Sequence, residues 1–155
     1  MKLRIVALGH KLPSWVAEAY ADYARRMPRA LSLELVELKA GPRDRGKSTE
    51  QVLAAEAERI AAAIRGFHVI ALDERGLRWT TPELARALGG WRDSAFDAAF
   101  VIGSADGLAE SVKRDANVVI ALSALTLPHG LARVILAEQL YRAASLLQGH
   151  PYHRE

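Results

Sequence analysis

Short apolar runs alternate along this chain with longer segments in which apolar residues recur every three or four positions. Runs of that length are typical of buried strands, and the longer spacing is typical of helices with one apolar face. The pattern predicts strands at residues 3–8, 31–36, 67–72, 98–102 and 117–122, and helices starting near residues 14, 48, 81 and 131. This alternation predicts an α/β fold, a mostly parallel sheet with helices on both faces, in a single domain over residues 1–155.

Local signals indicate where the first two helices begin and which faces they bury. Ser14 is the expected N-cap of the first helix, and Ser48 with Gln51 forms a capping box for the second. The first helix has an apolar face made of Val16, Ala19, Tyr20, Tyr23 and Met27. The second has one made of Leu53, Ala57, Ile60, Ala61 and Ile64. The strand at 31–36 alternates apolar and polar residues, which predicts a half-exposed position near a sheet edge.

The last predicted helix, from Leu131 to Leu147, is apolar around most of its circumference. Its apolar residues include Val134, Ile135, Leu136, Ala137, Leu140, Tyr141 and Ala144. A helix of this kind is either deeply buried or lies at a subunit interface. We therefore expect a homodimer.

Charge and composition narrow the classes of partner. The formal charge is +3 and the isoelectric point is about 9.4, which favours an anionic partner such as nucleic acid. The absence of cysteine excludes disulfides and thiolate metal sites and is compatible with a reducing cytoplasm. No apolar stretch has the length of a membrane span, and the N-terminal segment lacks a signal-peptide pattern. We expect a cytoplasmic protein that has no membrane partner.

The segment GPRDRGKS, residues 41–48, fits the phosphate-loop pattern, and VIALDE, residues 69–74, is similar to a magnesium-holding strand. A phosphate loop works through converging backbone N–H groups, yet Pro42 has none to donate and Asp44 would repel phosphate. These residues favour an exposed basic loop that leads into a capped helix. Four cations within residues 39–47, Lys39, Arg43, Arg45 and Lys47, are candidates for contacting a nucleic acid backbone. A magnesium-dependent nucleotide hydrolase stays open as the alternative.

Three loops should meet at one edge of the sheet, because the carboxyl ends of parallel strands lie together and ligands bind there. They are residues 72–76, 103–107 and 122–130. Gly103 and Gly107 would permit close approach of a ligand to the backbone or satisfy a tight turn. Thr126 and nearby backbone amides precede the long helix, where N–H groups have no helical partner and can receive a polar ligand.

Three separated motifs resemble one family. LSALTLPHGLARVILAEQLYRA, residues 122–143, FVIGSADG, residues 100–107, and the terminal HPYHRE are similar to the RlmH family of ribosomal RNA methyltransferases, of the SPOUT class. The resemblance covers the whole chain. The sequence departs from the family at Ser104, where many relatives have a second glycine, and at Gly130, where proline is common.

The resemblance implies an enzyme that methylates N3 of a pseudouridine in large-subunit (23S) ribosomal RNA, on the assembled ribosome. It further implies a homodimer, a C-terminal trefoil knot, S-adenosylmethionine as cofactor and no metal. The family's cofactor positions correspond to Leu72, Gly103, Leu122, Ser123, Ala124, Leu125, Thr126 and Leu127. These positions lie in the three loops that the strand order brings to one edge.

The reaction requires N3 of the pseudouridine ring to lose a proton before it attacks the methyl group, so the site must supply a base or stabilise an anion. The resemblance assigns this chemistry to the tail of one subunit acting at the cofactor of the other. In this hypothesis His153 assists deprotonation or hydrogen-bonds the uracil edge, Tyr152 stacks on or orients the base, and Arg154 holds a phosphate or carbonyl oxygen. Arg142 and His129 are weaker candidates for contacting the substrate. A ribosome-associated protein that binds RNA without catalysis is a further alternative.

Overall fold

The computed structural model describes residues 1–9, 11–42 and 46–153, with His153 described in its backbone only. Five strands form one sheet in the order β2-β1-β4-β3-β5, and every neighbouring pair runs parallel. The strands are β1 (Lys2–Gly9), β2 (Ser32–Lys39), β3 (His68–Leu77), β4 (Ala98–Ile102) and β5 (Val118–Ile120). The helices are α1 (Ser14–Arg26), α2 (Thr49–Ala63), α3 (Thr81–Asp93), α4 (Glu110–Asp115) and α5 (His129–Leu147), followed by the 3-10 helix η1 (Pro151–His153).

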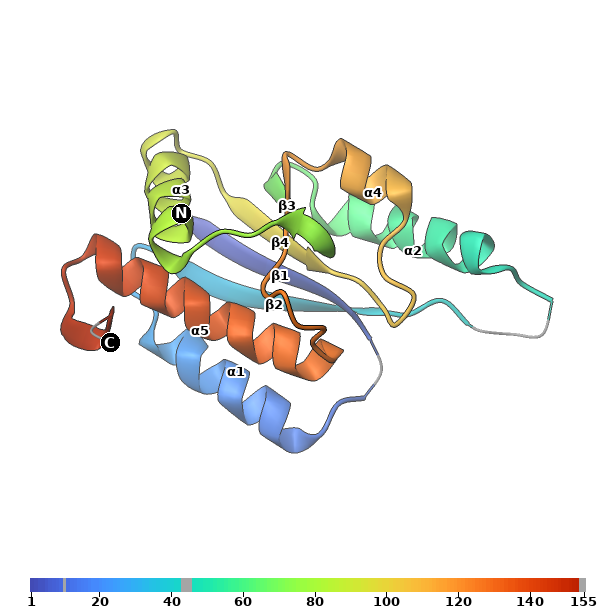
Figure 1. The fold of residues 1–155 in the computed structure, drawn as a ribbon, viewed down its shortest axis with the longest axis horizontal. Helices are drawn as coiled ribbons and strands as arrows, with labels where there is room; N and C mark the ends of the chain where they lie inside the picture. The colour runs from blue at the N-terminus through green and yellow to red at the C-terminus, as the bar shows by residue number, and fades with distance from the viewer. Residues whose placement is uncertain (10, 43–45, 154–155) are drawn as a thin grey trace.

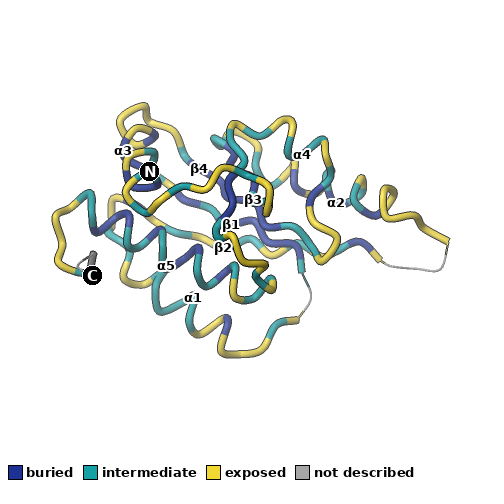
Figure 2. Tube along the Cα trace, in the orientation of Figure 1, coloured by how far each residue is buried: buried dark blue, intermediate teal, exposed yellow. Residues whose placement is uncertain are grey.

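Helices cover both faces of the sheet, as Figure 1 shows. Helices α1, α3 and α5 lie on one face, and α2 and α4 lie on the other. The alternation of side chains along β1 explains how one strand serves both layers. Leu3, Ile5 and Ala7 pack with α3 and α5, whereas Val6 and Leu8 pack with α2 and α4. β4, most of β1 and the first half of β3 are consequently buried between two apolar layers, and Figure 2 shows these parts of the sheet in dark blue.

The fold class and most of the element order predicted from the pattern are confirmed. All five expected strands form, and β2 occupies an edge, where its burial alternates as the sequence indicated. The capping box of α2 is present. The Ser48 hydroxyl accepts a hydrogen bond from the Gln51 backbone amide, and the side-chain oxygen of Gln51 accepts one from the Ser48 backbone amide. Helix α3 has a second capping box, formed by Thr80 and Glu83.

Several predicted boundaries differ from the structure. Ser14 is the first helical residue and not the N-cap, because the carbonyl of Pro13 already accepts from the Val16 amide at 3.1 Å. The strand predicted to end at Leu72 continues to Leu77, and both of these residues pair with Ile120 of β5. The residues between them therefore bulge out of the ladder, and the sequence DERG is part of an interrupted strand and not a simple loop.

The buried face of α2 also differs from the prediction. Its buried residues are Val52, Glu56 and Ile60, whereas Ala61, expected in the core, is exposed. The long helix begins two residues earlier than predicted, at His129, and packs between α1 and α3 within the chain. Much of the apolar surface of α5 is thus already covered without a second subunit. Within the described ranges, no helix is both long and apolar enough to cross a membrane.

Candidate functional site

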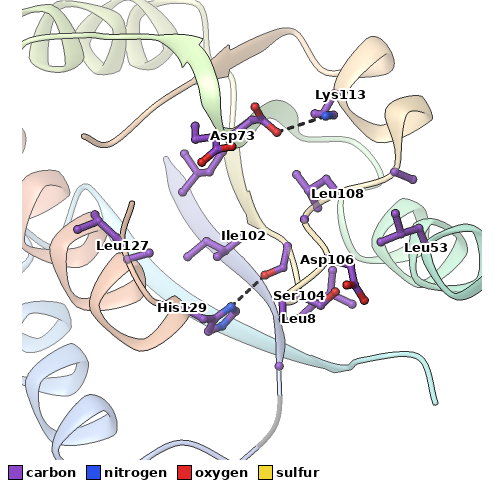
Figure 3. Close-up of a pocket in the computed structure, with 18 of the residues that line it drawn as sticks. Leu8, Leu53, Asp73, Ile102, Ser104, Asp106, Leu108, Lys113, Leu127 and His129 are labelled. Atoms are coloured by element: carbon purple, nitrogen blue, oxygen red, sulfur yellow. Dashed lines mark hydrogen bonds and ion pairs between the residues drawn. The ribbon is translucent and has the colours of Figure 1, made fainter. Parts of the chain in front are cut away.

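A cavity of about 1050 Å³ opens at the carboxyl ends of the strands. Its walls come from the ends of β1, β3 and β4 and from the segment between β5 and α5, as Figure 3 shows in close-up. Leu8, Leu53, Ile102, Leu108 and Leu127 give it an apolar lining. A cavity of this size, with apolar walls and a few polar groups, is typical of sites for cofactor-sized ligands.

The structure brings together the loops that the strand order predicted to meet. Seven of the eight residues that the resemblance assigned to the cofactor line this cavity: Leu72, Gly103, Leu122, Ser123, Leu125, Thr126 and Leu127. Ala124 is exposed and is not among the lining residues. The convergence of three distant segments on one cavity follows from the parallel sheet, since each segment leaves the same edge.

The loop at residues 103–107, hereafter the 103–107 loop, is a tight turn that requires its glycines. The amide of Gly107 donates to the carbonyl of Ser104 at 2.9 Å, and Gly107 has a φ of 80°, which favours glycine. A Cβ on Gly103 would lie 2.5 Å from the carbonyl carbon of Gly107. Only a residue without a side chain fits at Gly103, and its backbone is open to the cavity.

His129, the first residue of α5, contacts the 103–107 loop from the opposite wall (Figure 3). Its Nδ1 lies 3.0 Å from the carbonyl oxygen of Gly103, and its Nε2 lies 3.1 Å from Nη2 of Arg133. Burial is the main cause that lowers the pKa of His129, and the positive charge of Arg133 lowers it further. The hydrogen bond with Gly103 and the negative charge of Glu37 raise the pKa, but the net shift is downward. Both ring nitrogens are engaged within the chain, so His129 has no free nitrogen with which to take a proton from a substrate.

Arg133 lies one turn after His129 and is only 3 % exposed. Its Nη1 forms an ion pair of 2.9 Å with Glu37 of the edge strand β2. This pairing offsets part of the cost of burying a guanidinium. Consecutive contacts thus connect Glu37 of β2, Arg133 and His129 of α5, and Gly103 in the loop after β4.

A buried carboxylate supports the same loop from α2. Glu56 is 2 % exposed, and its two oxygens accept from the Gly41 amide at 2.8 Å and from the Ser104 hydroxyl at 3.1 Å. Ser104, a departure from the family pattern, therefore has a defined partner. One carboxylate fixes both the 103–107 loop and the beginning of the segment GPRDRGKS.

These contacts weaken the nucleotide-hydrolase alternative. The amide of Gly41 binds a carboxylate, which would compete with phosphate, and the Ser48 side chain caps α2. Residues 43–45 lie outside the described residues. Asp73, the first acid of the segment VIALDE, pairs with Lys113 at 3.2 Å. Among the described residues, no group of three or more acidic or histidine side chains is arranged to hold a metal ion.

The pair of Asp73 and Lys113 forms a charged end of the cavity (Figure 3). Lys113 also pairs with Glu110 at 2.8 Å, which is the main cause of its raised pKa. Burial alone would raise the pKa of Asp73, but hydrogen bonds from the Arg75 amide and from Lys113 together lower it. Asp73 is consequently ionised and paired at neutral pH.

Among the predicted catalytic residues of the tail, Tyr152 has a described side chain, and it does not line the cavity of its own chain. Tyr152 lies against the far part of α5, where its hydroxyl donates to Glu138 at 3.1 Å and the Arg142 guanidinium lies 4.9 Å from its ring centre. Arg142 forms an ion pair of 2.7 Å with Glu138. Burial, followed by interactions with Tyr23 and Glu138, raises the pKa of Tyr152 to about 12. Arg154 lies outside the described residues, as does the side chain of His153.

Sequence reasoning missed Glu56 and Arg133, although each left a signal. Glu56 falls between Val52 and Ile60 at a spacing of four residues, so a carboxylate interrupts an apolar helical stripe. Arg133 interrupts the apolar helix four residues after His129. A charged residue within an apolar stripe indicates a buried partner, but the pattern does not identify that partner.

Comparison with known proteins identifies the family. The family described as "Predicted SPOUT methyltransferase" matches residues 1–153. The chain is 54 % identical to the ribosomal RNA large subunit methyltransferase H of Nitrosospira multiformis, and likewise to that of Burkholderia multivorans, with 99 % of each chain covered.

Solved structures with low sequence identity share the fold. A methylase family protein from Haemophilus influenzae superposes with a TM-score of 0.60 at 17 % identity, covering 99 % of this chain and 70 % of that one. TrmJ from Z. mobilis superposes with a TM-score of 0.57 at 17 % identity, covering 90 % and 69 %.

Proposed function

Because the chain belongs to the SPOUT methyltransferase family, we propose that it is the S-adenosylmethionine-dependent enzyme that methylates N3 of a pseudouridine in large-subunit (23S) ribosomal RNA. The observation that carries the proposal is the convergence of seven predicted cofactor residues on one cavity. Relatives 54 % identical over nearly the whole chain are named as large-subunit ribosomal RNA methyltransferases, which supports the substrate class.

The residues of the cavity fit this cofactor. The apolar walls near Leu72 and Leu127 suit an adenine ring, and Ser123 and Thr126 are polar residues of the same lining. Gly103 leaves space where any side chain would clash with Gly107. The charged end at Asp73 and Lys113 suits the ammonium and carboxylate of an amino acid moiety.

When bound, S-adenosylmethionine supplies a methyl group activated by a sulfonium. The protein must orient the uracil ring and remove or neutralise the proton on N3. In the proposal His153 assists that deprotonation, Tyr152 orients the ring and Arg154 stabilises negative charge on an oxygen. The raised pKa of Tyr152 keeps its phenol neutral at physiological pH, so Tyr152 acts as a hydrogen-bond donor or packing surface and not as a base.

The proposed enzyme works as a homodimer in which the tail of one subunit reaches the cofactor bound by the other. Two observations support this arrangement. Tyr152 does not line the cavity of its own chain, and two large apolar residues are exposed in the segments that line it: Leu125 by 76 % and Leu131, between the lining residues His129 and Ala132, by 39 %. Large exposed apolar residues mark interaction surfaces when they gather together. Activity should accordingly fall when the protein is diluted below its dimer dissociation constant. The trefoil knot that the resemblance implies is part of the same proposal.

The test begins with calorimetry of S-adenosylmethionine, with magnesium-ATP in a parallel cell. Binding of the first ligand alone supports the proposal, whereas binding of ATP alone would replace it with the hydrolase alternative. The second step measures transfer of labelled methyl to unmethylated ribosomes and to free ribosomal RNA. RNA binding without methyl transfer, and without S-adenosylmethionine binding, would establish the non-catalytic alternative instead.

A further inference from the structure

The imidazole of His129 is held from three directions. The Gly103 carbonyl lies 3.0 Å from Nδ1, and Arg133 lies 3.1 Å from Nε2. On a third side Gly9 of β1 approaches so closely that a Cβ there would lie 3.2 Å from Nε2. The ring therefore has one orientation, and it bridges the start of α5 to the end of β4.

The partners of the ring also determine where its proton lies. A carbonyl oxygen only accepts hydrogen bonds, and a guanidinium only donates them. Nδ1 must therefore carry the hydrogen that Gly103 accepts, while Nε2 presents its lone pair to Arg133. Arg133 is itself held in place by Glu37 at 2.9 Å. The result is a neutral imidazole in one tautomer.

We propose that His129 is a positioning residue for the cofactor: fixed by Arg133 as the neutral Nδ1–H tautomer, it holds the Gly103 carbonyl and so the 103–107 loop in its binding-competent position. This inference rests on the proposed function, because Gly103 is one of the predicted cofactor residues. This role of His129 is distinct from contact with the substrate and from proton transfer.

The same geometry makes cofactor binding sensitive to acid. A proton on Nε2 would face the Arg133 guanidinium, so two donors and two positive charges would meet where one hydrogen bond now exists. Among the described residues, the charged groups acting on His129 are Arg133 of α5 and Glu37 of β2, and the latter is already paired with Arg133. Protonation should therefore displace the ring and release Gly103, which weakens cofactor binding.

Two substitutions separate the roles of the two ring nitrogens. In His129→Asn the side-chain amide occupies the place of Nδ1 and can still donate to Gly103. In His129→Gln the amide reaches the place of Nε2 and loses the Gly103 contact. Calorimetry of S-adenosylmethionine with the full-length protein should show a dissociation constant about tenfold higher for His129→Gln than for the wild type. The constant for His129→Asn should be close to that of the wild type.

The pH profile provides a second readout that a merely structural role would not produce. Wild-type affinity should fall as pH decreases below 6.5, because burial lowers the pKa of His129 below that ordinary value, whereas the affinity of His129→Asn should change much less. Any titration of S-adenosylmethionine itself is common to both proteins and cancels in the comparison. Parallel profiles for the two proteins would overturn the inference, as would equal affinities of the Asn and Gln variants.

Leu127→Glu distinguishes failure of this inference from failure of the proposed function. Leu127 lines the cavity, so a carboxylate there should block cofactor binding if the cavity is the cofactor site. Wild-type protein that does not bind the cofactor, or Leu127→Glu protein that binds it normally, would contradict the proposed site. Normal binding by His129→Gln, together with blocked binding by Leu127→Glu, would contradict the positioning role alone. Circular dichroism checks that each variant is folded.

Discussion

The hydroxyl of Ser104 donates a hydrogen bond to Oε2 of Glu56 at 3.1 Å, while Oε1 of the same carboxylate accepts from the Gly41 amide at 2.8 Å. A single buried side chain on α2 thus joins the 103–107 loop to the segment after β2. Because these two segments leave the same sheet edge on either side of β1, Glu56 fixes their separation. Its removal should affect stability and the cavity together.

Glu56→Gln should destabilise the fold. An amide has one accepting oxygen, so its NH₂ group would face one of the two donors, and a buried donor would lose its partner. The expected cost is on the order of 1–3 kcal/mol, measured by urea unfolding. Glu58→Gln is the control, because Glu58 is exposed on the same helix, and it should change stability by less than about 0.5 kcal/mol. Equal effects of the two substitutions would contradict the assignment.

The contrast between Ser48 and Glu56 shows what the sequence could predict. The capping box at Ser48 depends on residues three positions apart, so the pattern contains both partners. Glu56 binds Ser104 across 48 residues, and Arg133 binds Glu37 across 96, so neither partner could be read from local spacing. The strand order placed the three loops at one edge, but the resemblance alone identified their cofactor.

The wrong prediction for the end of β3 also results from a partner that lies far away in the sequence. Residues 73–76 carry turn-forming chemistry in DERG, and local propensity predicts a loop there. The chain nevertheless returns to pair Leu77 with Ile120, and the Ala121 amide donates to the Leu77 carbonyl at 2.8 Å. This pairing depends on β5, which lies more than forty residues later in the sequence, so tertiary contacts override the local preference.

Gly76→Ala should destabilise the protein at this crossing of β3 and β5. A Cβ on Gly76 would lie 2.5 Å from the carbonyl carbon of Ile120, so the backbones must separate. Overpacking of this kind costs roughly 1–3 kcal/mol, and thermal unfolding should show a lower midpoint.

Gly90→Ala is the matched control for that substitution. Gly90 lies within α3, and a Cβ there would meet nothing within 4 Å. Alanine in a helix interior is more favourable than glycine by about 0.5–1 kcal/mol, so the midpoint should rise. A decrease of similar size in both variants would show that the close approach at Gly76 is not the cause.

Acidification should destabilise the fold through His129. Its pKa lies below 6.5, mainly because of burial, so as pH falls below 6.5 the unfolded chain binds a proton before the folded chain does. The contribution of His129 is complete above pH 6.5 and is lost as pH falls toward the folded-state pKa. The slope for one such group is at most about 1.4 kcal/mol per pH unit.

Urea unfolding of wild-type protein and His129→Asn at a series of pH values tests this linkage. The variant should lose part of the decline below pH 6.5 and keep the part due to His68, whose pKa burial also lowers. Identical declines in the two proteins would show that His129 is protonated equally in the folded and unfolded states.

Tyr152→Phe should reduce methyl transfer without weakening cofactor binding. The substitution removes the hydroxyl that donates to Glu138 at 3.1 Å and so loosens the cluster of Tyr152, Glu138 and Arg142. Loss of one hydrogen bond of this kind corresponds to about a tenfold lower rate. Since Tyr152 does not line the cavity of its own chain, the ring that remains should preserve the cofactor site.

Tyr141→Phe is the matched control, because the Tyr141 ring lies 4.5 Å from that of Tyr152 and the substitution keeps this packing. Methyl transfer to ribosomes and calorimetry of S-adenosylmethionine should be measured on both variants. A rate loss confined to Tyr152→Phe supports a role of the tail in orienting the substrate. Weakened cofactor binding in Tyr152→Phe would instead mean that the tail helps to build the cofactor site itself, and the proposed division between cavity and tail would have to be abandoned.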